Sequence, residues 1–271
     1  MPDVFANIAG APLPLLEMIA SVLELRASMP QQQEMQRTYL RDIDFPEGAR
    51  VLEVGCGTGA VARVVAGWPR VGEVVGVDPS PFLVDRARTL SSHLLNLVFE
   101  VGDGRALSLK DESFDVVVLH TVLTHVQGPE AMLAEAHRVL RPGGWLGVCD
   151  GDFSTATLAT GDLDPLEVCV HAFVDGFVED RWMVRRMSSL AAAAGFEVSP
   201  LRSYGLVETA KPGLTLTWVD RGADVLAGRG RLSQEFAAAL KVEAKRRADA
   251  NAFFGYMAYA SMVGRKPQAG R

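Results

Sequence analysis

Cysteine is scarce in this chain of 271 residues, with three in all: Cys56, Cys149 and Cys169. Their spacing fits neither a disulfide framework nor a metal site, so we expect free thiols, a cytoplasmic location and no metal ion. Long apolar segments are also lacking, because no run reaches the roughly 18 to 20 residues that a membrane-spanning helix needs. No basic segment precedes an apolar one near Asp3, so we expect neither a secretory signal nor a membrane span.

An overall excess of positive charge is absent as well. The formal net charge is −6, which argues against a nucleic-acid-binding role for the whole chain. From Arg229 to the end, however, nine Lys or Arg stand against three Asp or Glu. We interpret this excess as the solvated face of a helix that carries Lys241, Lys245, Arg246 and Arg247, with a binding patch as the alternative. The expected partner is a small molecule, and a homodimer is left open.

Internal repeats and low-complexity segments are missing too, and 48% hydrophobic with 22% charged residues is ordinary globular composition. Between Arg50 and Asp150, short β-prone runs alternate with helical segments. The run over 114–120 is almost entirely apolar after Asp115, as expected for a strand that is covered on both faces. This alternation predicts an α/β fold with a parallel sheet and right-handed crossovers. The expected strands are 51–54, 74–78, 97–101, 114–120 and 145–149.

The segments on either side of this alternation divide the chain into regions. Residues 1–48 predict an N-terminal helical cap, and residues 49–271 a main domain. Beyond Asp150 the pattern loosens, and the stretches 151–190 and 212–250 are interpreted as lid insertions that shape a substrate pocket. Only one clear helix is expected in the second insertion, from Gln234 on.

Aromatic side chains are concentrated in the first insertion, at Phe153, Phe173, Phe177 and Trp182. We expect this insertion and the N-terminal helices to cover the ligand site and to form an apolar pocket. Such a pocket suits a mostly apolar or aromatic small molecule.

A glycine-rich loop, Gly55-Cys56-Gly57-Thr58-Gly59, follows the first expected strand. Glycine permits a tight turn and the close approach of a ligand, and the start of the next helix favours an anionic group. Asp78 follows about 20 residues later, where it could bind ribose hydroxyls. Because Ala60 stands behind the last glycine, the loop also fits the dinucleotide fingerprint. The loop alone therefore leaves a nicotinamide cofactor open.

Other motifs separate the alternatives. Glu53 stands two residues before the first glycine, where nicotinamide-binding folds usually have an apolar residue. Asp103-Gly104 ends the third strand, Phe114-Asp115-Val116-Val117 opens the fourth, and His137-Arg138-Val139-Leu140-Arg141-Pro142-Gly143-Gly144 precedes the fifth. With these motifs in order, residues 50–150 resemble the class I S-adenosylmethionine-dependent methyltransferases, in particular those of quinone and natural-product biosynthesis.

The resemblance implies a doubly wound, Rossmann-like sheet of seven strands. It would be mostly parallel, with an antiparallel last strand that we assign to 253–263. The implied cofactor is S-adenosyl-L-methionine. Its sulfonium and ammonium groups suit a site with several carboxylates, whereas a pyrophosphate does not.

The resemblance also implies roles for individual residues. The glycine loop would pass under the methionine part of the cofactor, with Glu53 near its amino group. Asp78 would accept the ribose hydroxyls, and Asp103 or the backbone beside it would receive the adenine amino group. The complete cofactor-binding set is Glu53, Gly55, Cys56, Gly57, Thr58, Gly59, Asp78, Pro79, Asp103, Gly104 and His120.

Each of these residues could instead have a purely structural role. The glycines could serve only the turn, and Glu53 could cap neighbouring backbone. Asp78 and Asp103 could hydrogen-bond their own turns. Cys56 is interpreted as a packing residue without a nucleophilic role.

Candidates for catalysis stand at the ends of the fourth and fifth strands. Methyl transfer to oxygen or carbon usually needs a base, and His120 or His125 could serve as one, contact the substrate, or only pack. Asp150 could orient the substrate or cap the next segment. The implied function is methyl transfer to an O, N or C atom of a small, mostly apolar or aromatic metabolite. The alternatives are an NAD(P)-dependent oxidoreductase and an S-adenosylmethionine-binding protein with another activity.

Overall fold

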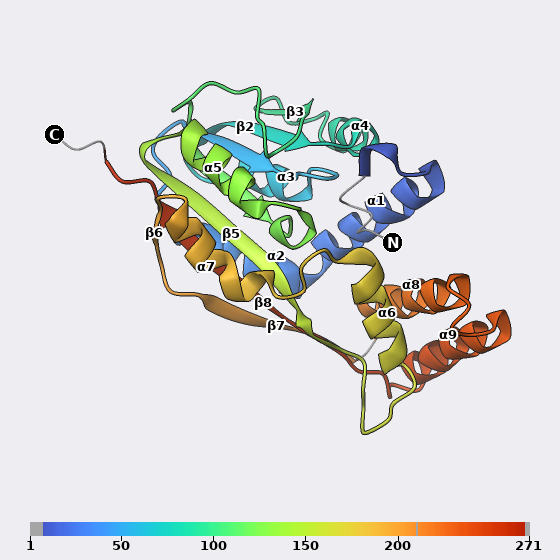
Figure 1. Cartoon of the computed structure of the whole chain (residues 1–271). Helices are drawn as coiled ribbons and strands as arrows, with labels where there is room; N and C mark the ends of the chain where they lie inside the picture. The colour runs from blue at the N-terminus through green and yellow to red at the C-terminus, as the bar shows by residue number, and fades with distance from the viewer. Residues whose placement is uncertain (1–7, 210, 269–271) are drawn as a thin grey trace.

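The protein is a mixed α/β structure built around one twisted sheet (Figure 1). The computed structural model describes residues 8–209 and 211–268. Within these residues the sheet has eight strands, and its main path follows the order β3-β2-β1-β4-β5-β8-β6, with β7 also paired to β8. The strands are β1 (Ala49–Val54), β2 (Val71–Asp78), β3 (Leu97–Val101), β4 (Phe114–His120), β5 (Leu140–Thr157), β6 (Glu197–Val198), β7 (Arg202–Glu208) and β8 (Gly255–Arg265).

Strand direction follows the prediction. β3, β2, β1, β4 and β5 are parallel, and β8 is antiparallel to β5, β6 and β7. Where a sheet of seven strands would have one sixth strand, the segment 197–208 forms two, β6 and β7, so the described residues have eight strands and not seven. Pro200 lies at the break and has no N–H to donate to the ladder, which interrupts the strand locally.

Helices cover both faces of the sheet. They are α1 (Leu13–Ser28), α2 (Pro30–Leu40), α3 (Ala60–Ala66), α4 (Pro81–Leu90), α5 (Pro129–Val139), α6 (Glu167–Phe177), α7 (Met183–Ala193), α8 (Leu214–Gly228) and α9 (Gln234–Asp249). On β4, Val116 and Val118 pack toward α2 and α3, whereas Val117 and Leu119 pack toward α5 and α7. All four side chains are fully buried, which confirms the expectation of a strand covered on both faces.

The fifth strand is much longer than the predicted 145–149. It continues to Thr157 and pairs with β8 along most of its length, so the first expected insertion begins within a strand. Asp150 and Asp152 made this segment look like a loop. Their carboxylates are in fact buried and accept hydrogen bonds from the backbone N–H groups of Thr124, Gly151 and Ser154, so they fit a strand interior.

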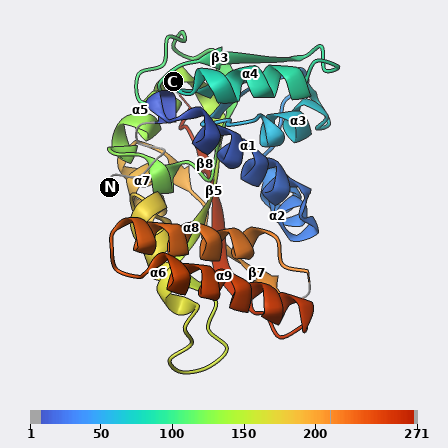
Figure 2. The same cartoon turned by 90° about the vertical axis from the view of Figure 1, so that its right-hand side faces the viewer.

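The long strands carry a helical layer beyond the edge of the sheet. α6, α8 and α9 lie together there, apart from the helices that cover the sheet faces (Figure 2). α8 was not expected, because Thr215, Thr217 and Gly222 weaken its helical pattern. Its first turn is held by Glu208, whose carboxylate accepts hydrogen bonds from the N–H groups of Gly213, Leu214 and Thr215.

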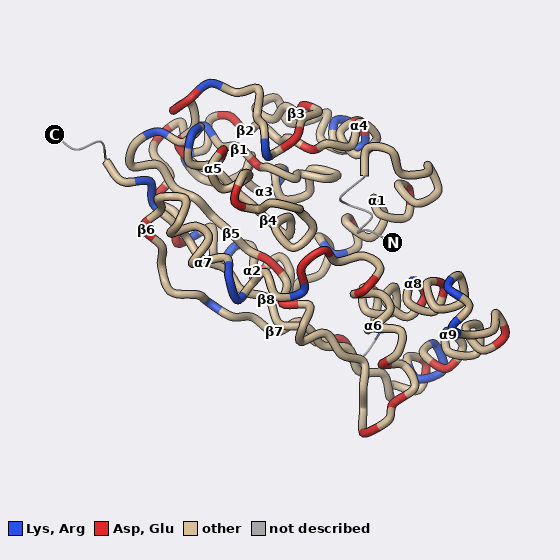
Figure 3. Tube along the Cα trace, viewed as in Figure 1, with Lys and Arg blue, Asp and Glu red and all other residues tan. Residues whose placement is uncertain are grey.

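The basic C-terminal region lies mainly on α9, where positive and negative side chains alternate (Figure 3). Lys241 pairs with Asp224, and Arg246 pairs with Glu243. Arg247 pairs with Asp164 at 2.6 Å, and both side chains are largely buried. Lys245 and Arg246 are exposed on the helix face as expected, whereas Arg247 departs from the expectation because its ion pair is largely buried. Among the described residues, no helix has both the length and the apolar character needed to cross a bilayer.

The contact between α6 and α8 gives a prediction about stability. A Cβ atom at Gly222 would lie 1.9 Å from the carbonyl oxygen of Cys169, a backbone atom that cannot rotate away. Gly222→Ala should therefore lower the free energy of unfolding by about 1 to 3 kcal/mol, the usual cost of overpacking. Chemical denaturation followed by circular dichroism measures this change.

Gly228, in the same helix, is the matched control, because a Cβ atom there meets nothing within 4 Å. Gly228→Ala should leave stability unchanged or raise it by up to about 1 kcal/mol through helix propensity. Equal stability of the two variants would contradict the close approach of α6 and α8.

Candidate active site

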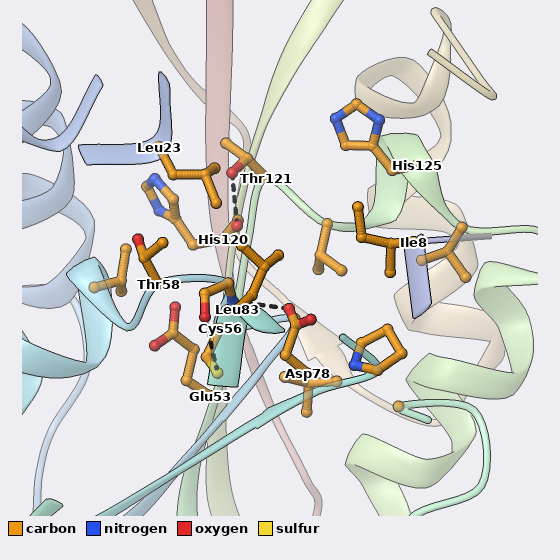
Figure 4. Close-up of a pocket in the computed structure, with 18 of the residues that line it drawn as sticks. Ile8, Leu23, Glu53, Cys56, Thr58, Asp78, Leu83, His120, Thr121 and His125 are labelled. Atoms are coloured by element: carbon orange, nitrogen blue, oxygen red, sulfur yellow. Dashed lines mark hydrogen bonds between the residues drawn. The ribbon is translucent and has the colours of Figure 1, made fainter. Parts of the chain in front are cut away.

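A cavity of about 330 Å³ lies at the carboxyl edge of the parallel strands, under α1 and α2. This edge is where open α/β sheets bind their ligands. Figure 4 shows side chains from the ends of β1, β2 and β4 converging on it. Ten of the eleven predicted cofactor-binding residues line the cavity, namely Glu53, Gly55, Cys56, Gly57, Thr58, Asp78, Pro79, Asp103, Gly104 and His120.

The glycine loop forms the floor of this cavity. Gly55 and Gly57 have φ angles of 73° and 53°, the left-handed region that glycine adopts at no steric cost. Asp78 fixes the loop, because one carboxylate oxygen accepts a hydrogen bond from Gly57 N at 2.8 Å (dashed in Figure 4). The other oxygen accepts from Ser80 N at 2.9 Å. Asp78 thus makes the local hydrogen bonds considered as its alternative role, and it also faces the cavity.

Gly59 is the predicted residue that does not line the cavity. It has a φ of 76°, and a Cβ atom there would lie 2.4 Å from the ring of Phe99. Gly59 therefore serves the turn into α3 and its packing against β3, which was the local alternative for the loop glycines.

Two buried carboxyl groups give the cavity its electrostatic character. Burial raises the pKa of Glu53 to about 8 and that of Asp78 to about 6. For Glu53, a backbone hydrogen bond from Ala62 opposes this effect, and the neighbouring charge of Asp78 adds to it. One oxygen of Glu53, Oε2, has no hydrogen-bond partner among the described residues. A cationic group in the cavity would favour the ionised form of both carboxyl groups.

Asp103 and Gly104 lie at the end of the cavity next to β3. The Asp103 carboxylate is exposed and paired with Arg105 at 2.8 Å, and the Arg105 guanidinium holds the pKa of Asp103 below its usual value. At Gly104 a Cβ atom would lie 2.3 Å from Val54 and 2.8 Å from Met132, so a side chain there would collide with the wall.

The first two helices cover this site as expected, but none of the residues that they contribute was predicted from the sequence. Arg26 from α1 and Gln32 and Gln36 from α2 line the cavity, and both glutamines are buried. Gln32 Oε1 and Gln36 Nε2 have no hydrogen-bond partner among the described residues. The two glutamines are four residues apart on one helix face. This four-residue spacing could have indicated that both side chains face one site, but a helix with many polar residues is usually interpreted as exposed to solvent.

The cover formed by α1 is anchored to the glycine loop. Leu23 lies over Gly57, so that a Cβ atom on the glycine would be 2.8 Å from its methyl group. Glu24 accepts two hydrogen bonds from the guanidinium of Arg63 on α3, at 2.8 and 2.7 Å. Arg63 also donates to the carbonyl oxygen of Thr58 in the loop. One arginine thus joins α1, α3 and the cavity floor.

His120 ends β4 as predicted and lies in the wall of the cavity. Its Nδ1 atom is hydrogen-bonded to the hydroxyl of Tyr39 at 3.0 Å, and the two rings are stacked. Burial lowers the pKa of His120 to about 3, so the ring is neutral at physiological pH. The next residue, Thr121, has a φ of 54°, an uncommon conformation for a β-branched residue. This turn directs the chain from β4 into the short 3₁₀ helix η2 (Leu123–His125).

A second, smaller cavity of about 70 Å³ adjoins the first. Leu23, Arg26 and His125 line both cavities. Phe153, Phe173 and Phe177 line the second cavity, as expected of the first insertion, together with Trp218 from α8. Trp182, the fourth aromatic residue of that prediction, is about half exposed and lines neither cavity.

Asp150 is fully buried behind η2 and lines neither cavity. Its carboxylate accepts a hydrogen bond from Thr124 N, which fixes the start of η2. Burial raises the pKa of Asp150, and the adjacent His125 lowers it. His125 is thus the catalytic candidate at the junction of the two cavities, and Asp150 lies behind it.

The buried carboxyl group of Glu53 predicts a pH-dependent stability of the ligand-free protein. Its folded-state pKa, about 8, is above the ordinary value of 4.5. The contribution of this group is therefore fully present below pH 4.5 and is lost as the pH rises toward 8. Glu53→Gln should exceed the wild type in unfolding free energy at pH 8 by roughly 1 to 3 kcal/mol.

The same comparison at pH 5 should show little or no gain for Glu53→Gln. Urea denaturation at the two pH values measures both quantities. Glu100→Gln, at an exposed position on β3, is the control and should change neither. A gain for Glu53→Gln that is equal at both pH values would contradict the raised pKa.

Comparisons with known proteins agree with this geometry. A family model described as a methyltransferase domain matches residues 52–148. The chain is 32% identical over 179 residues to an uncharacterized 37.1 kDa protein in transposon TN4556 of Streptomyces fradiae, a match that covers 66% of this chain and 52% of that protein. It is 36% identical over 124 residues to the demethylmenaquinone methyltransferase of Tropheryma whipplei, covering 45% and 50%.

The chain thus spans about half the length of these curated relatives. Among solved structures, the YcgJ protein from Bacillus subtilis superposes with a TM-score of 0.61 at 17% identity, over 88% of this chain and 100% of that one. At this identity the likeness concerns the fold. Residues 52–148 thus match a methyltransferase domain, and the strand order and the glycine loop with its acidic neighbours agree with that match.

Proposed function

We propose that this protein transfers the methyl group of S-adenosylmethionine to an O, N or C atom of a small, mostly apolar or aromatic metabolite. The observation that carries the proposal is the junction of the two cavities. An acidic cavity at the edge of the sheet meets an aromatic one at Leu23, Arg26 and His125. The relative from Tropheryma whipplei is named for a menaquinone precursor, which agrees with an aromatic acceptor.

The polar groups of the first cavity fit the methionine end of this cofactor. Three buried atoms there have no hydrogen-bond partner among the described residues: Glu53 Oε2, Gln32 Oε1 and Gln36 Nε2. Two acceptors and one amide donor match an ammonium and a carboxylate group. Each carboxylate oxygen of Asp78 accepts one backbone N–H and retains a lone pair for a ribose hydroxyl.

When bound, S-adenosylmethionine supplies an electrophilic methyl group on a sulfonium. The task of the protein is then to hold the acceptor close and aligned and to exclude water. α1 covers part of the first cavity, where Leu23 lies over Gly57 of the glycine loop.

We propose different roles for the two histidines. His120, with a pKa of about 3 and a hydrogen bond to Tyr39, is a weak base and acts as a positioning residue in the cavity wall. His125 lies where acceptor and cofactor would meet, and we propose that it takes the proton of an O–H or C–H acceptor. Asp150 holds η2, and its charge would stabilise the protonated ring of His125.

We also propose a cytoplasmic location. Cys56, Cys149 and Cys169 are all free and buried, as in proteins of reducing compartments. Cell fractionation with an antibody to the protein tests this assignment.

Two measurements test the methyl transfer itself. Calorimetric titration should show binding of S-adenosylhomocysteine and no binding of NAD, which would exclude the oxidoreductase alternative. Incubation with S-adenosylmethionine and a panel of aromatic metabolites should give a product heavier by one methyl group. S-adenosylhomocysteine must accumulate in equal amount, because another activity of the same fold would leave the cofactor unchanged.

Asp78 gives a prediction about cofactor affinity. Asp78→Asn should weaken binding of S-adenosylhomocysteine by about 1.5 to 3 kcal/mol, the value of hydrogen bonds to a charged group. Titration calorimetry on the variant, with circular dichroism to verify folding, measures the change. Asp103→Asn is the control and should weaken binding less, because Asp103 is exposed and paired with Arg105. An equal or larger effect at Asp103 would overturn this ranking.

His125 gives a prediction about turnover. For an acceptor with a proton to lose, His125→Gln should lower the single-turnover rate by roughly 10²-fold to 10⁴-fold. Affinity for S-adenosylhomocysteine should stay within about twofold. His93→Gln, at an exposed position after α4, is the control and should leave the rate unchanged. Rapid-quench mass spectrometry provides the measurement, and an unaltered rate in His125→Gln would remove the residue from catalysis.

A further inference from the structure

The aromatic cavity contains a cation that its own walls do not neutralise. Phe173 stacks on Trp218 with ring centroids 5.8 Å apart and on Phe177 at 5.5 Å. Arg221, on α8, places its guanidinium 5.8 Å from the Phe173 ring and 5.3 Å from the Phe177 ring. Its Nε and Nη2 atoms are buried and have no hydrogen-bond partner among the described residues.

Such a guanidinium is costly to bury. Burial lowers the pKa of Arg221 to about 10, which still leaves the side chain charged at neutral pH. Contact with aromatic faces offsets only part of the lost hydration. The N–H groups of both atoms are unused, and one from each forms the planar fork that binds carboxylates.

The lining of the aromatic cavity supplies no negative charge to this group. None of the described residues that line it is Asp or Glu, whereas Arg26 and Arg221 both do. Asp220, the neighbour of Arg221 in sequence, is exposed and is not part of the lining, and its charge only partly opposes the effect of burial on the pKa of Arg221. The side of Arg221 that faces the cavity therefore lacks a counter-charge.

We propose that the aromatic cavity binds the anionic end of the acceptor, and that Arg221 recognises a carboxylate attached to a planar aromatic body. This inference rests on the proposed methyl transfer and adds that the acceptor carries a negative charge. The ring of the acceptor would lie among Phe153, Phe173 and Trp218, which line the same cavity. Its reacting atom would then face the first cavity across the shared residues Arg26 and His125.

The two cavities would in this way sort the two substrates by charge. Glu53 and Asp78 suit a cationic donor in the first cavity, and Arg221 suits an anionic acceptor in the second, with Arg26 lining both. A neutral ring of the same shape would leave the N–H donors of Arg221 buried and unpaired. Discrimination against neutral analogues follows from that penalty.

Matched acid and amide probes test the proposal. With the protein saturated by S-adenosylhomocysteine, calorimetry compares benzoate with benzamide and 1-naphthoate with 1-naphthamide at constant ionic strength. In the wild type, at least one acid should bind about 10-fold or more tightly than its amide, as expected for a charge-assisted pair. Equal binding of acid and amide in both pairs overturns the proposal.

Variants of Arg221 assign the preference to this residue. Arg221→Met should reduce the ratio of acid to amide affinity to about threefold or less, and Arg221→Lys should retain part of it. Arg229→Met, at the exposed end of α8, is the control and should keep the wild-type ratio. A wild-type ratio in Arg221→Met would overturn the assignment. If Arg221→Met does not fold, the comparison of acid and amide affinities in the wild type still tests the proposal.

Thermal unfolding without probes separates recognition from a structural role. Removal of an unpaired buried charge should leave the melting temperature of Arg221→Met unchanged or higher. A lower melting temperature with an unchanged probe ratio would identify Arg221 as a packing residue only. Failure to bind S-adenosylhomocysteine would refute the proposed methyl transfer, whereas normal binding of it without acid preference would refute this inference alone.

Discussion

One carboxylate, that of Asp78, fixes the geometry on which the site depends. It accepts hydrogen bonds from the backbone N–H groups of Gly57 and Ser80, and so ties the loop after β1 to the turn after β2. The two loops meet because β1 and β2 are parallel neighbours whose carboxyl ends lie at the same edge. α1 can cover the loop only when its backbone is held there, since Leu23 lies directly over Gly57. The floor and the cover of the cavity therefore both depend on the hydrogen bonds of the Asp78 carboxylate.

Charge is distributed over the two cavities in opposite senses. The first contains two buried carboxyl groups whose pKa values are raised by burial, and it has no cation in hydrogen-bond contact with them among the described residues. The second contains arginines and no described acidic residue in its lining. Both arrangements cost folding free energy in the ligand-free protein. Binding sites that contain such destabilising groups usually gain this free energy back when a ligand pairs with them.

The helical layer formed by α6, α8 and α9 explains how the second cavity is built. β5 and β8 extend beyond the rest of the sheet and lead to this layer (Figures 1 and 2). Residues of α6 and α8 line the second cavity, which shares Leu23, Arg26 and His125 with the first. Gly222 lets α8 approach the backbone of α6, and Glu208 fixes the first turn of α8. Together these contacts place Trp218 and Arg221 against the aromatic rings of α6. The second cavity thus depends on contacts between segments that are distant in the chain.

The sequence by itself predicted the parallel sheet, its glycine loop and ten residues that line the first cavity. These features depend on local patterns, such as the apolar run of β4, the left-handed glycines and the acidic residues at strand ends. The length of β5, the split of the sixth strand at Pro200 and the existence of α8 were not predictable in this way. In each case pairing or capping from elsewhere in the chain outweighs local propensity. Only the tertiary structure brought Gln32, Gln36 and Arg221 into the cavities, because the burial of a polar side chain depends on its neighbours in space.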